Sequence, residues 1–289
     1  MTAPTVNTAN IEQAEAWNGT EGEYWTMHAD HYDRAGSRHW RRFLDAELST
    51  PGDIVLDIGC GTGKSTRDVG RAVPSGSVLG VDLSAVMLGL ARERTATDGL
   101  TNVAYLQADA QVHDLGAPRF DLGLSCFGAM FFSDPHAAFA NVARSLAPRG
   151  RLALLAWREL PRNEWLVEIR AALAHGRDLP LPPPDAPTPF SLADPDRVRA
   201  LLNGSGYDDI DFEAVDEPLE FGATVEDAFG FMQTLGIVRG LAHDLGERES
   251  ARALDALRAV VDAHHGRDGV LFGSSAWLIT ARRGTGTPS

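Results

Sequence analysis

The chain has 289 residues, of which 44% are hydrophobic and 23% charged, values typical of a globular protein. Its net charge of −14, with no stripe of basic residues, disfavours a nucleic-acid partner because phosphates bind clustered Lys and Arg. No apolar run of about 18 residues predicts a membrane span, and the N-terminus has no secretory pattern, so we expect a cytoplasmic protein.

The first 50 residues predict helices. Apolar and aromatic residues recur at intervals of three and four between residues 11 and 48, which is typical of helices lying on a larger body. Pro51 and Gly52 end this segment. We therefore treat residues 1–50 as an N-terminal helical cap.

Strand and helix patterns alternate over residues 51–157. We predict strands at 54–58, 78–81, 103–107, 120–126 and 152–157, with helices at 64–73, 84–97 and 135–146 between them. Continuous apolar strands separated by helices indicate a parallel sheet that is covered on both faces.

The alternation stops after residue 157. We expect a helix near 163–174, a Pro-rich loop at 179–189, a helix at 194–202, a strand at 210–215, helices over 224–265 and one final strand at 270–281. The predicted division is a core at 51–157, helical or loop lid insertions at 158–192 and 222–268, and the remainder of the core at 193–221 and 269–283.

A glycine cluster follows the first predicted strand, in the sequence VLDIGCGTGKS at 55–65. Glycines let a ligand approach the backbone, and the start of the next helix offers free N–H donors. A Walker A loop does not fit, because its first glycine is replaced by Ile58. A dinucleotide fingerprint matches at Gly59 and Gly61 but has Lys64 where its third glycine is needed.

Three aspartates stand at the carboxyl ends of successive predicted strands. Asp57 precedes Gly59 by two residues and could attract an α-ammonium group, directly or through water. Asp82 ends the second strand, where a carboxylate can accept hydrogen bonds from ribose hydroxyls, and Asp109 follows the third strand, where it could accept from an adenine amino group. Each alone is more often a turn or helix cap, but together they indicate a site for a nucleoside that carries an amino acid.

At these residues the chain resembles the class I S-adenosylmethionine-dependent methyltransferases over roughly residues 50–160. The segments that carry the resemblance are the glycine motif at 55–63, the acidic strand at 79–83, the adenine-side motif at 107–110, the fourth strand with its loop at 120–132, and the turn into the fifth strand at 147–157. The resemblance is nearest to enzymes of the ubiquinone and menaquinone pathways and of natural-product biosynthesis. The N-terminal segment from Trp17 to Asp33 also resembles that group.

The resemblance implies a fold and a cofactor. The fold is α/β: a Rossmann-like parallel sheet with an antiparallel final strand, helices on both faces and helical lid additions. The cofactor is S-adenosyl-L-methionine, covered by the N-terminal helices. The residues that the resemblance places around it are Tyr24, Trp25, Tyr32, Asp57, Gly59, Cys60, Gly61, Gly63, Asp82, Leu83, Met87, Asp109, Ala110 and Ser125.

Catalysis in such a site can rest on positioning, because the sulfonium already makes its methyl group electrophilic. If a base takes part, our candidates are His28, Tyr32 and His136, with His28 first because it falls one turn from Tyr32. Each of these histidines alone is more often a surface or hydrogen-bonded structural residue than a base.

Aromatic residues after the fourth and fifth strands have two interpretations. They could be ordinary core packing, or they could form an apolar wall for a hydrophobic or aromatic acceptor. The residues concerned are Phe127, Met130, Phe131, Phe132, Trp157, Trp165 and Phe190.

The predicted function is methyl transfer to a small molecule at oxygen, carbon or nitrogen, in secondary or quinone-like metabolism. The alternatives are a cyclase or binding protein that keeps the cofactor without transferring its methyl group, an NAD(P)-dependent oxidoreductase, and, least favoured, a nucleotide hydrolase. Cys60 and Cys126 have no CxxC partner and no metal is expected. We expect a monomer or a homodimer.

Overall fold

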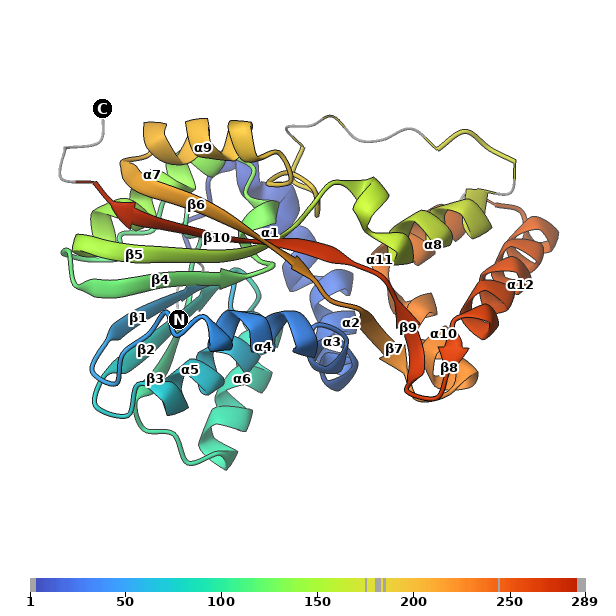
Figure 1. Ribbon diagram of the computed structural model, residues 1–289, viewed down its shortest axis with the longest axis horizontal. Helices are drawn as coiled ribbons and strands as arrows, with labels where there is room; N and C mark the ends of the chain where they lie inside the picture. Colours follow the sequence, from blue (N-terminus) through green and yellow to red (C-terminus); the bar gives the residue numbers. More distant parts are fainter. Residues whose placement is uncertain (1–3, 175, 180–182, 184–185, 244, 285–289) are drawn as a thin grey trace.

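A seven-stranded sheet forms the centre of the protein (Figure 1). The computed structural model describes residues 4–174, 176–179, 183, 186–243 and 245–284. Neighbouring strands follow the order β3-β2-β1-β4-β5-β10-β6. Their bounds are β1 Ile54–Ile58, β2 Ser77–Asp82, β3 Val103–Gln107, β4 Phe120–Cys126, β5 Leu146–Trp157, β6 Tyr207–Asp216 and β10 Ser275–Arg283.

The direction of the strands confirms the predicted fold class. β1 to β5 are parallel to one another, and β10 inserts antiparallel between β5 and β6. The final strand of the chain is therefore the antiparallel one, as the resemblance implied. This arrangement brings the carboxyl ends of β1 to β5 to one edge of the sheet, where ligands of open α/β folds bind.

Alternating side chains of the strands bury the two faces of the sheet under helices. Val55 belongs to a buried cluster with Trp40 and Phe43 of α4 (Ser37–Asp45), which also includes Val69 of α5 (Lys64–Ala72). The next residue, Leu56, belongs to a second cluster with residues of α7 (Pro135–Ser145) and α9 (Pro195–Gly204). The expected continuous apolar strands thus reflect a sheet that is buried on both sides.

The other elements of the core, apart from β5, lie close to their predicted positions. α6 (Ala85–Thr97) packs on β3 and begins at Ser84, whose Oγ accepts a hydrogen bond from Met87 N at 3.3 Å. β3 and β4 have their predicted bounds. β5 begins six residues earlier than predicted, because Leu146 already pairs with Phe120 before a register shift.

A second, three-stranded antiparallel sheet was not predicted. Its order is β7-β9-β8, with β7 Leu219–Gly222, β8 His265–Gly266 and β9 Gly269–Phe272. The prediction of one strand over 270–281 was wrong, since Gly273 and Ser274 separate β9 from β10. At this break Gly273 N donates to Glu164 Oε2 at 2.6 Å and Ser274 Oγ donates to Glu217 O at 2.6 Å.

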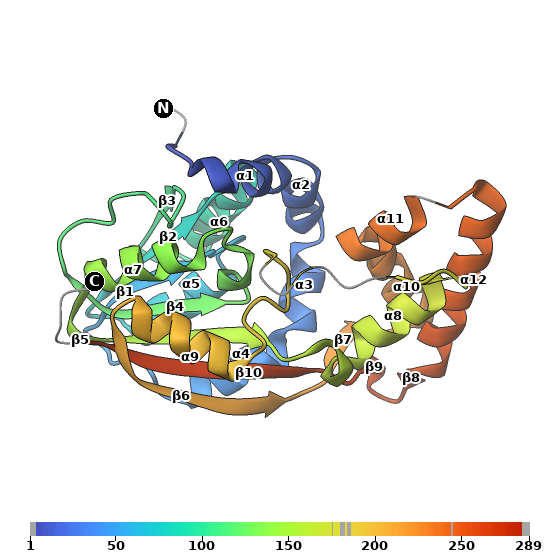
Figure 2. The ribbon, with the colours of Figure 1, turned by 90° about the horizontal axis from the view of Figure 1, so that it is seen from above.

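The small sheet and the helices that follow and precede it form a lobe beside the main sheet (Figures 1 and 2). The helices are α8 (Glu164–Ala174), α10 (Val225–Thr234), α11 (Gly236–His243) and α12 (Glu247–Ala263), and we call this lobe with its sheet the lid. The predicted helical stretch 224–265 overran at its end, because His265 pairs in β8. Of the predicted Pro-rich loop, residues 180–182 and 184–185 lie outside the described residues.

The N-terminal segment forms short helices that run from the main sheet to the lid (Figure 2). They are η1 (Thr8–Asn10), α1 (Ile11–Asn18), α2 (Thr20–Met27) and α3 (Ala29–Ala35), followed by α4. α2 packs on α6 of the core, and α3 packs on β7 of the lid. From here on the cap means residues 7–35, which is the part of the predicted cap (residues 1–50) that precedes α4. Within the described ranges, no helix combines the length and apolar character needed to cross a bilayer.

The loops that leave β1 and β4 touch through two glycines. Gly59 has a φ of +66°, a conformation that side chains rarely adopt, and Gly128 lies directly against it. A Cβ added to Gly128 would stand 2.8 Å from Gly59 O and 3.0 Å from Gly59 Cα. Because both neighbours are backbone atoms, the contact leaves no room for a side chain.

We expect Gly128→Ala to lower the free energy of unfolding by about 1–3 kcal/mol, because the added methyl group overpacks a backbone contact. The matched control is Gly89→Ala, which adds a methyl group to α6 where no atom lies within 4 Å. That variant should gain up to about 1 kcal/mol from helix propensity. Denaturant unfolding of both variants checks the prediction, and equal stabilities would contradict it.

Candidate functional site

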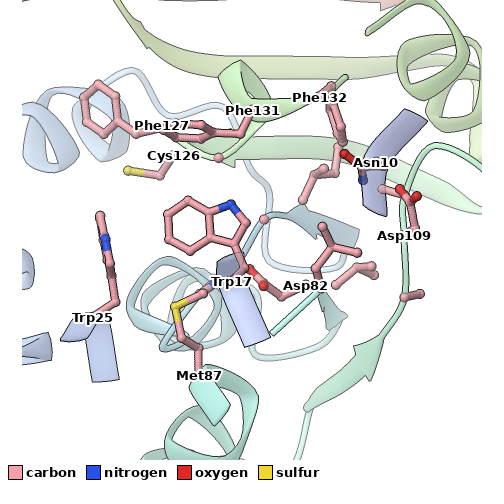
Figure 3. A pocket seen from close by; sticks show the side chains of 18 residues that line it. Asn10, Trp17, Trp25, Asp82, Met87, Asp109, Cys126, Phe127, Phe131 and Phe132 are labelled. Carbon is pink, nitrogen blue, oxygen red and sulfur yellow. Dashed lines mark hydrogen bonds between the residues drawn. The ribbon is translucent and has the colours of Figure 1, made fainter. Parts of the chain in front are cut away.

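A pocket lies at the carboxyl ends of β1, β2 and β4, beneath the cap (Figure 3). It contains about 760 Å³ of empty space, counting the part that is open to solvent. Eight of the residues predicted to bind a cofactor line it, namely Trp25, Gly59, Gly61, Asp82, Leu83, Met87, Asp109 and Ala110. The structure thus brings together the strand-end residues whose proximity the sequence predicted.

The glycine bend has two different roles. Gly61 has a φ of +53°, and a Cβ there would meet only Met87 Sδ, at 3.8 Å, so this glycine opens onto the pocket. Gly63 has a φ of +77° and begins α5. A Cβ on Gly63 would stand 2.5 Å from the Tyr105 hydroxyl and 2.8 Å from Ala91 Cβ, so this glycine serves packing of the helix rather than the pocket wall.

Asp57 is fully buried, and only one of its two carboxylate oxygens has hydrogen-bond partners. Its Oδ2 accepts hydrogen bonds from Ser65 Oγ and Thr66 Oγ1, both at 2.7 Å, whereas its Oδ1 has no partner. Burial raises the pKa of this carboxyl to about 6. An unpaired, buried carboxylate oxygen is costly unless a ligand or water supplies a donor. Asp57 is not among the residues that line the pocket, so a ligand's ammonium group would reach this oxygen through a water molecule.

Asp82 lines the pocket and organises the turns around it. Its Oδ2 accepts from Gly61 N and its Oδ1 from Ser84 N, both at 2.8 Å. Burial raises the pKa of Asp82, while these backbone donors oppose the rise. Each carboxylate oxygen keeps a further lone pair, so the group can still accept from hydroxyls of a ligand.

Asp109 is buried at the other end of the pocket. Its Oδ2 accepts from Asn7 N at 2.9 Å, and its Oδ1 accepts from Gln111 N at 3.0 Å. The bond to Asn7 ties the start of the cap to the core. Asn10, which lines the pocket beside Asp109, accepts from Ser133 Oγ at 2.9 Å through its Oδ1.

Two tryptophans of the cap, Trp25 of α2 and Trp17 of α1, line the pocket (Figure 3). Trp17 makes edge contacts with Trp25 and Phe131, at centroid distances of 5.9 Å and 5.4 Å. Asn18 fixes this helix to the core, since its Nδ2 donates to Leu83 O and its Oδ1 accepts from Ala85 N, both at 3.0 Å. The sequence identified the motif that contains Trp17 but did not predict that its ring lines the pocket.

Several predicted binding residues lie outside the pocket wall. Ser125 Oγ donates to Ile58 O at 2.7 Å and accepts from Ala129 N at 3.0 Å, so it joins the ends of β1 and β4. Cys60 is buried, which raises the pKa of its thiol well above the ordinary value. Tyr24 and Tyr32 belong to the cap without lining the pocket.

Tyr32 acts on the pocket through a neighbour. Its ring stacks on Trp25 with a centroid distance of 3.6 Å and an interplanar angle of 7°, and its edge meets Phe231 of the lid at 5.0 Å. Burial raises the pKa of Tyr32, so its hydroxyl stays protonated at neutral pH. Its position supports Trp25 rather than a role as base.

The two histidines proposed as bases also lie outside the pocket wall. His136 Nε2 is 3.1 Å from Gly204 O and connects α7 to α9, so its position does not support a role in the pocket. His28 caps the end of α2, and partial burial together with nearby His31 lowers its pKa.

His39 is a buried histidine that the sequence analysis missed. It is fully buried on α4, its Nε2 lies 3.4 Å from Ser274 Oγ, and its Nδ1 has no partner. Its ring meets Phe127 and Trp157 edge-on, at 5.9 Å and 5.3 Å. Burial lowers the pKa of His39 to about 4. Its place beside the buried Trp40 and Phe43 was the available signal, but the same spacing is typical of a core helix.

Aromatic rings connect the two sides of the pocket through the lid. Phe127 stacks on Trp157 at 4.1 Å, and further ring contacts of 5.0–6.2 Å lead back to the Tyr32–Trp25 stack. We call this set the aromatic arc; its members are Phe127, Trp157, Trp165, Phe221, Phe231, Tyr32 and Trp25. Phe131 and Phe132 line the pocket itself, whereas Met130 is buried core and Phe190 packs on the core.

The cap is also bound to the lid. Glu21 of α2 forms an ion pair with Arg239 of α11, whose guanidinium lies 4.0 Å above the ring of Tyr24. His31 Nε2 of α3 lies 2.9 Å from Asp227 Oδ1 of α10. The element that covers the pocket is therefore held from both the core and the lid.

Comparison with known proteins identifies the core. Residues 55–150 match the family described as a methyltransferase domain. The matched segment spans the core from β1 to the start of β5 and is similar to the methyltransferase domains of that family.

Curated relatives of this segment include a methyltransferase of ubiquinone and menaquinone biosynthesis and an aklanonic acid methyltransferase. The ubiquinone/menaquinone biosynthesis C-methyltransferase UbiE of Cellvibrio japonicus is 35% identical over 156 residues, covering 53% of this chain and 62% of that protein. The aklanonic acid methyltransferase DauC of Streptomyces sp. strain C5 is 34% identical over 127 residues, covering 42% and 58%. The chain thus spans about three fifths of the length of these relatives.

A solved structure extends the likeness in fold. YcgJ of Bacillus subtilis superposes with a TM-score of 0.57 at 18% identity, covering 85% of this chain and 100% of that chain. At this identity the likeness concerns the fold alone.

The methyltransferase domain and the pocket agree on the cofactor. The carboxylate of Asp82 fits the ribose of S-adenosylmethionine, and the bare backbone at Gly61 admits a close approach. The unpaired Oδ1 of Asp57, which lies outside the pocket wall, would take the α-ammonium group through a water molecule. The residues present therefore suit this cofactor.

We expect acid to destabilise the protein more when His39 is present. Between its ordinary pKa of 6.5 and its folded pKa of about 4, the unfolded state binds the proton, so stability falls as pH decreases through this window. The loss between pH 7 and pH 4, measured against His39→Gln by denaturant unfolding, should be about 3 kcal/mol.

The comparison between the two proteins isolates His39. The buried carboxyls Asp33 and Asp57, whose pKa values are raised to about 6, and Asp216, the charge nearest His39, occur in both and cancel in the difference. Parallel stability curves from pH 7 to pH 4 would show that His39 is not buried as a neutral group.

We expect Arg239→Ala to release S-adenosylhomocysteine about fivefold faster, the equivalent of about 1 kcal/mol for a partly buried ion pair that holds the cap. Stopped-flow tryptophan fluorescence can follow the release, since Trp17 and Trp25 line the pocket. Arg258→Ala is the matched control, because Arg258 makes the same kind of contacts, to Glu226 and Phe229, entirely within the lid. Equal release rates for the two variants would refute the coupling.

Proposed function

We propose that this protein transfers a methyl group from S-adenosylmethionine to a small-molecule acceptor in quinone-like or secondary metabolism. The observation that carries the proposal is the pocket at the strand ends, in which the Asp82 carboxylate accepts a hydrogen bond from the bare glycine bend at Gly61. The named activities of UbiE and DauC support the same reaction class. A monomer or homodimer in the cytoplasm stays our expectation.

The pocket gives the cofactor a direction. Asp109 and Asn10 lie at one end, Asp82 lies in the middle, and Phe127 and Trp25 lie at the other end (Figure 3). We infer that Asp109 accepts from the adenine amino group and that Asp82 accepts from the ribose hydroxyls. The methionine portion then extends toward Phe127 and Trp25, and we call this the reactive end of the pocket.

The reactive end joins the aromatic arc. S-adenosylmethionine supplies an electrophilic methyl group, so this chain must orient the acceptor and exclude water. Phe127 and Trp25 belong both to the pocket wall and to the arc, whose other rings come from β5, the lid and Tyr32 of the cap. We propose that the acceptor is a flat, largely apolar molecule held between the core and the lid.

The pocket wall supplies no strong base. The titratable side chains that line it are Asp82, Asp109 and Cys126, and burial raises the pKa of the Cys126 thiol far above neutrality. Positioning is therefore the main contribution of the wall. This favours acceptors that are acidic enough to ionise readily, such as enols and phenols of quinone-like compounds. A proton-accepting role for His28 of the cap remains part of the proposal.

Binding of the cofactor product tests the proposal. We expect calorimetry to detect S-adenosylhomocysteine and Asp82→Asn to weaken it about 10- to 100-fold, because hydrogen bonds to a charged acceptor are lost. Asp121→Asn is the matched control: Asp121 accepts from Ile54 N at the opposite edge of the sheet. No heat with either S-adenosylmethionine or its product, or tight binding of NADH instead, would sink the proposal.

Transfer itself requires an acceptor screen. Cofactor with a labelled methyl group should be incubated with hydroxyquinones, naphthols and polycyclic phenols, and the products analysed by mass spectrometry. A labelled product supports transfer. A rearranged but unlabelled product would instead favour a cyclase that keeps its cofactor.

A further inference from the structure

Three parts of the molecule meet at His39. Its helix α4 follows the cap, and its ring contacts Phe127 and Trp157, which stand at the ends of β4 and β5. Its Nε2 contacts Ser274, in the short break between β9 of the lid and β10 of the core. A residue in this place lies on the helix that follows the cap and touches both the reactive end and the lid junction.

The hydrogen bonds fix the tautomer of His39. A serine hydroxyl carries one hydrogen, and Ser274 Oγ donates it to Glu217 O at 2.6 Å. Toward His39, 3.4 Å away, Ser274 Oγ can therefore only accept. Hence Nε2 carries the hydrogen and donates it to Ser274 Oγ, which in turn donates to Glu217 O. The other ring nitrogen, Nδ1, keeps a free lone pair.

The imidazole stands beside a strained wall of the pocket. Phe127 has a φ of +59°, in the left-handed region that non-glycine residues rarely adopt. Its N–H donates to Leu155 O at 3.0 Å, and the Gly59–Gly128 contact follows directly in the chain. The ring of Phe127 is held by its stack on Trp157, and His39 meets both members of that stack edge-on.

The charge of His39 also suits the reactive end. Its burial and the lack of an acceptor for a proton on Nδ1 keep the ring neutral. A protonated ring there would place a buried positive charge against the Phe127 wall of the reactive end. A neutral imidazole instead offers a donor to the lid junction without repelling the cofactor.

We propose that His39 is a positioning residue for methyl transfer, which links Ser274 at the lid junction to the Phe127–Trp157 stack at the reactive end. The inference rests on the proposed function. It acts on the orientation of the acceptor, because the stack continues into the aromatic arc. It does not act on the binding of the adenosyl group, which lies at the other end of the pocket.

Two variants of His39 and one of its partner test the link. His39→Leu keeps a side chain of similar size but removes the N–H donor, and Ser274→Ala removes the acceptor. His39→Gln restores an N–H near the position of Nε2. His265→Gln is the control, because His265 is exposed on the small sheet. Ser274→Ala keeps the test open if His39→Leu does not fold.

The kinetic readout separates positioning from folding. We expect His39→Leu and Ser274→Ala to lower kcat/KM for the acceptor about 10- to 100-fold, while the Kd of S-adenosylhomocysteine changes less than about threefold. His39→Gln should recover to within about fivefold of the wild type. If the variants only lower Tm, with kcat and KM unchanged for the folded protein, the proposal is wrong.

A spectroscopic readout does not depend on activity. In ¹⁵N-labelled holoprotein, the His39 resonances should show a protonated Nε2 and an unprotonated Nδ1 at neutral pH, and Ser274→Ala should mix the two tautomers. A protonated Nδ1 in the wild type would overturn the proposal. Failure of the wild type to bind S-adenosylhomocysteine would instead overturn the proposed function, so the two failures are distinguishable.

Discussion

The backbone contact between Gly59 and Gly128 is the constraint on which the site depends. Two neighbouring parallel strands, β1 and β4, end at the same height, and the chain leaves both without side chains between them. On one side the contact sets the bend that presents Gly61 to the pocket. On the other side it precedes Met130 and follows Phe127, whose left-handed backbone turns the chain into the pocket wall. The glycine bend at Gly61 and the Phe127 wall of the pocket therefore depend on the same backbone contact.

Much of this core could be predicted from the sequence, for a physical reason. Parallel strands buried on both faces need continuous apolar runs, and their carboxyl ends must share an edge, so Asp57, Asp82 and Asp109 had to lie near one another. The bounds of β3 and β4 were accordingly predictable, and so was the N-cap of α6 at Ser84. The spacing of the glycines also excludes the competing phosphate-binding loops, because each of those loops needs a glycine where this chain has Ile58 or Lys64.

The residues that the sequence misplaced are those whose surroundings come from far along the chain. The run 270–281 is largely apolar, and its break depends on Glu164 and Glu217, which approach only after folding. Ser125 looked free to face the cofactor, but both of its hydrogen-bonding roles are taken by Ile58 and Ala129. His39 shares its spacing with a core residue, and only its empty Nδ1 distinguishes it.

The passage between the two sheets has a mechanical consequence. β6 and β10 pair up to Asp216 and Ser275, and the same two chain segments pair again in the small sheet from Leu219 and Phe272. The lid is thus joined to the core by a two-stranded antiparallel ribbon, which passes from the large sheet to the small one within a few residues near Ser274. Because this ribbon passes from the core to the lid at Ser274, a displacement of the lid would act first on the contact between Ser274 and His39.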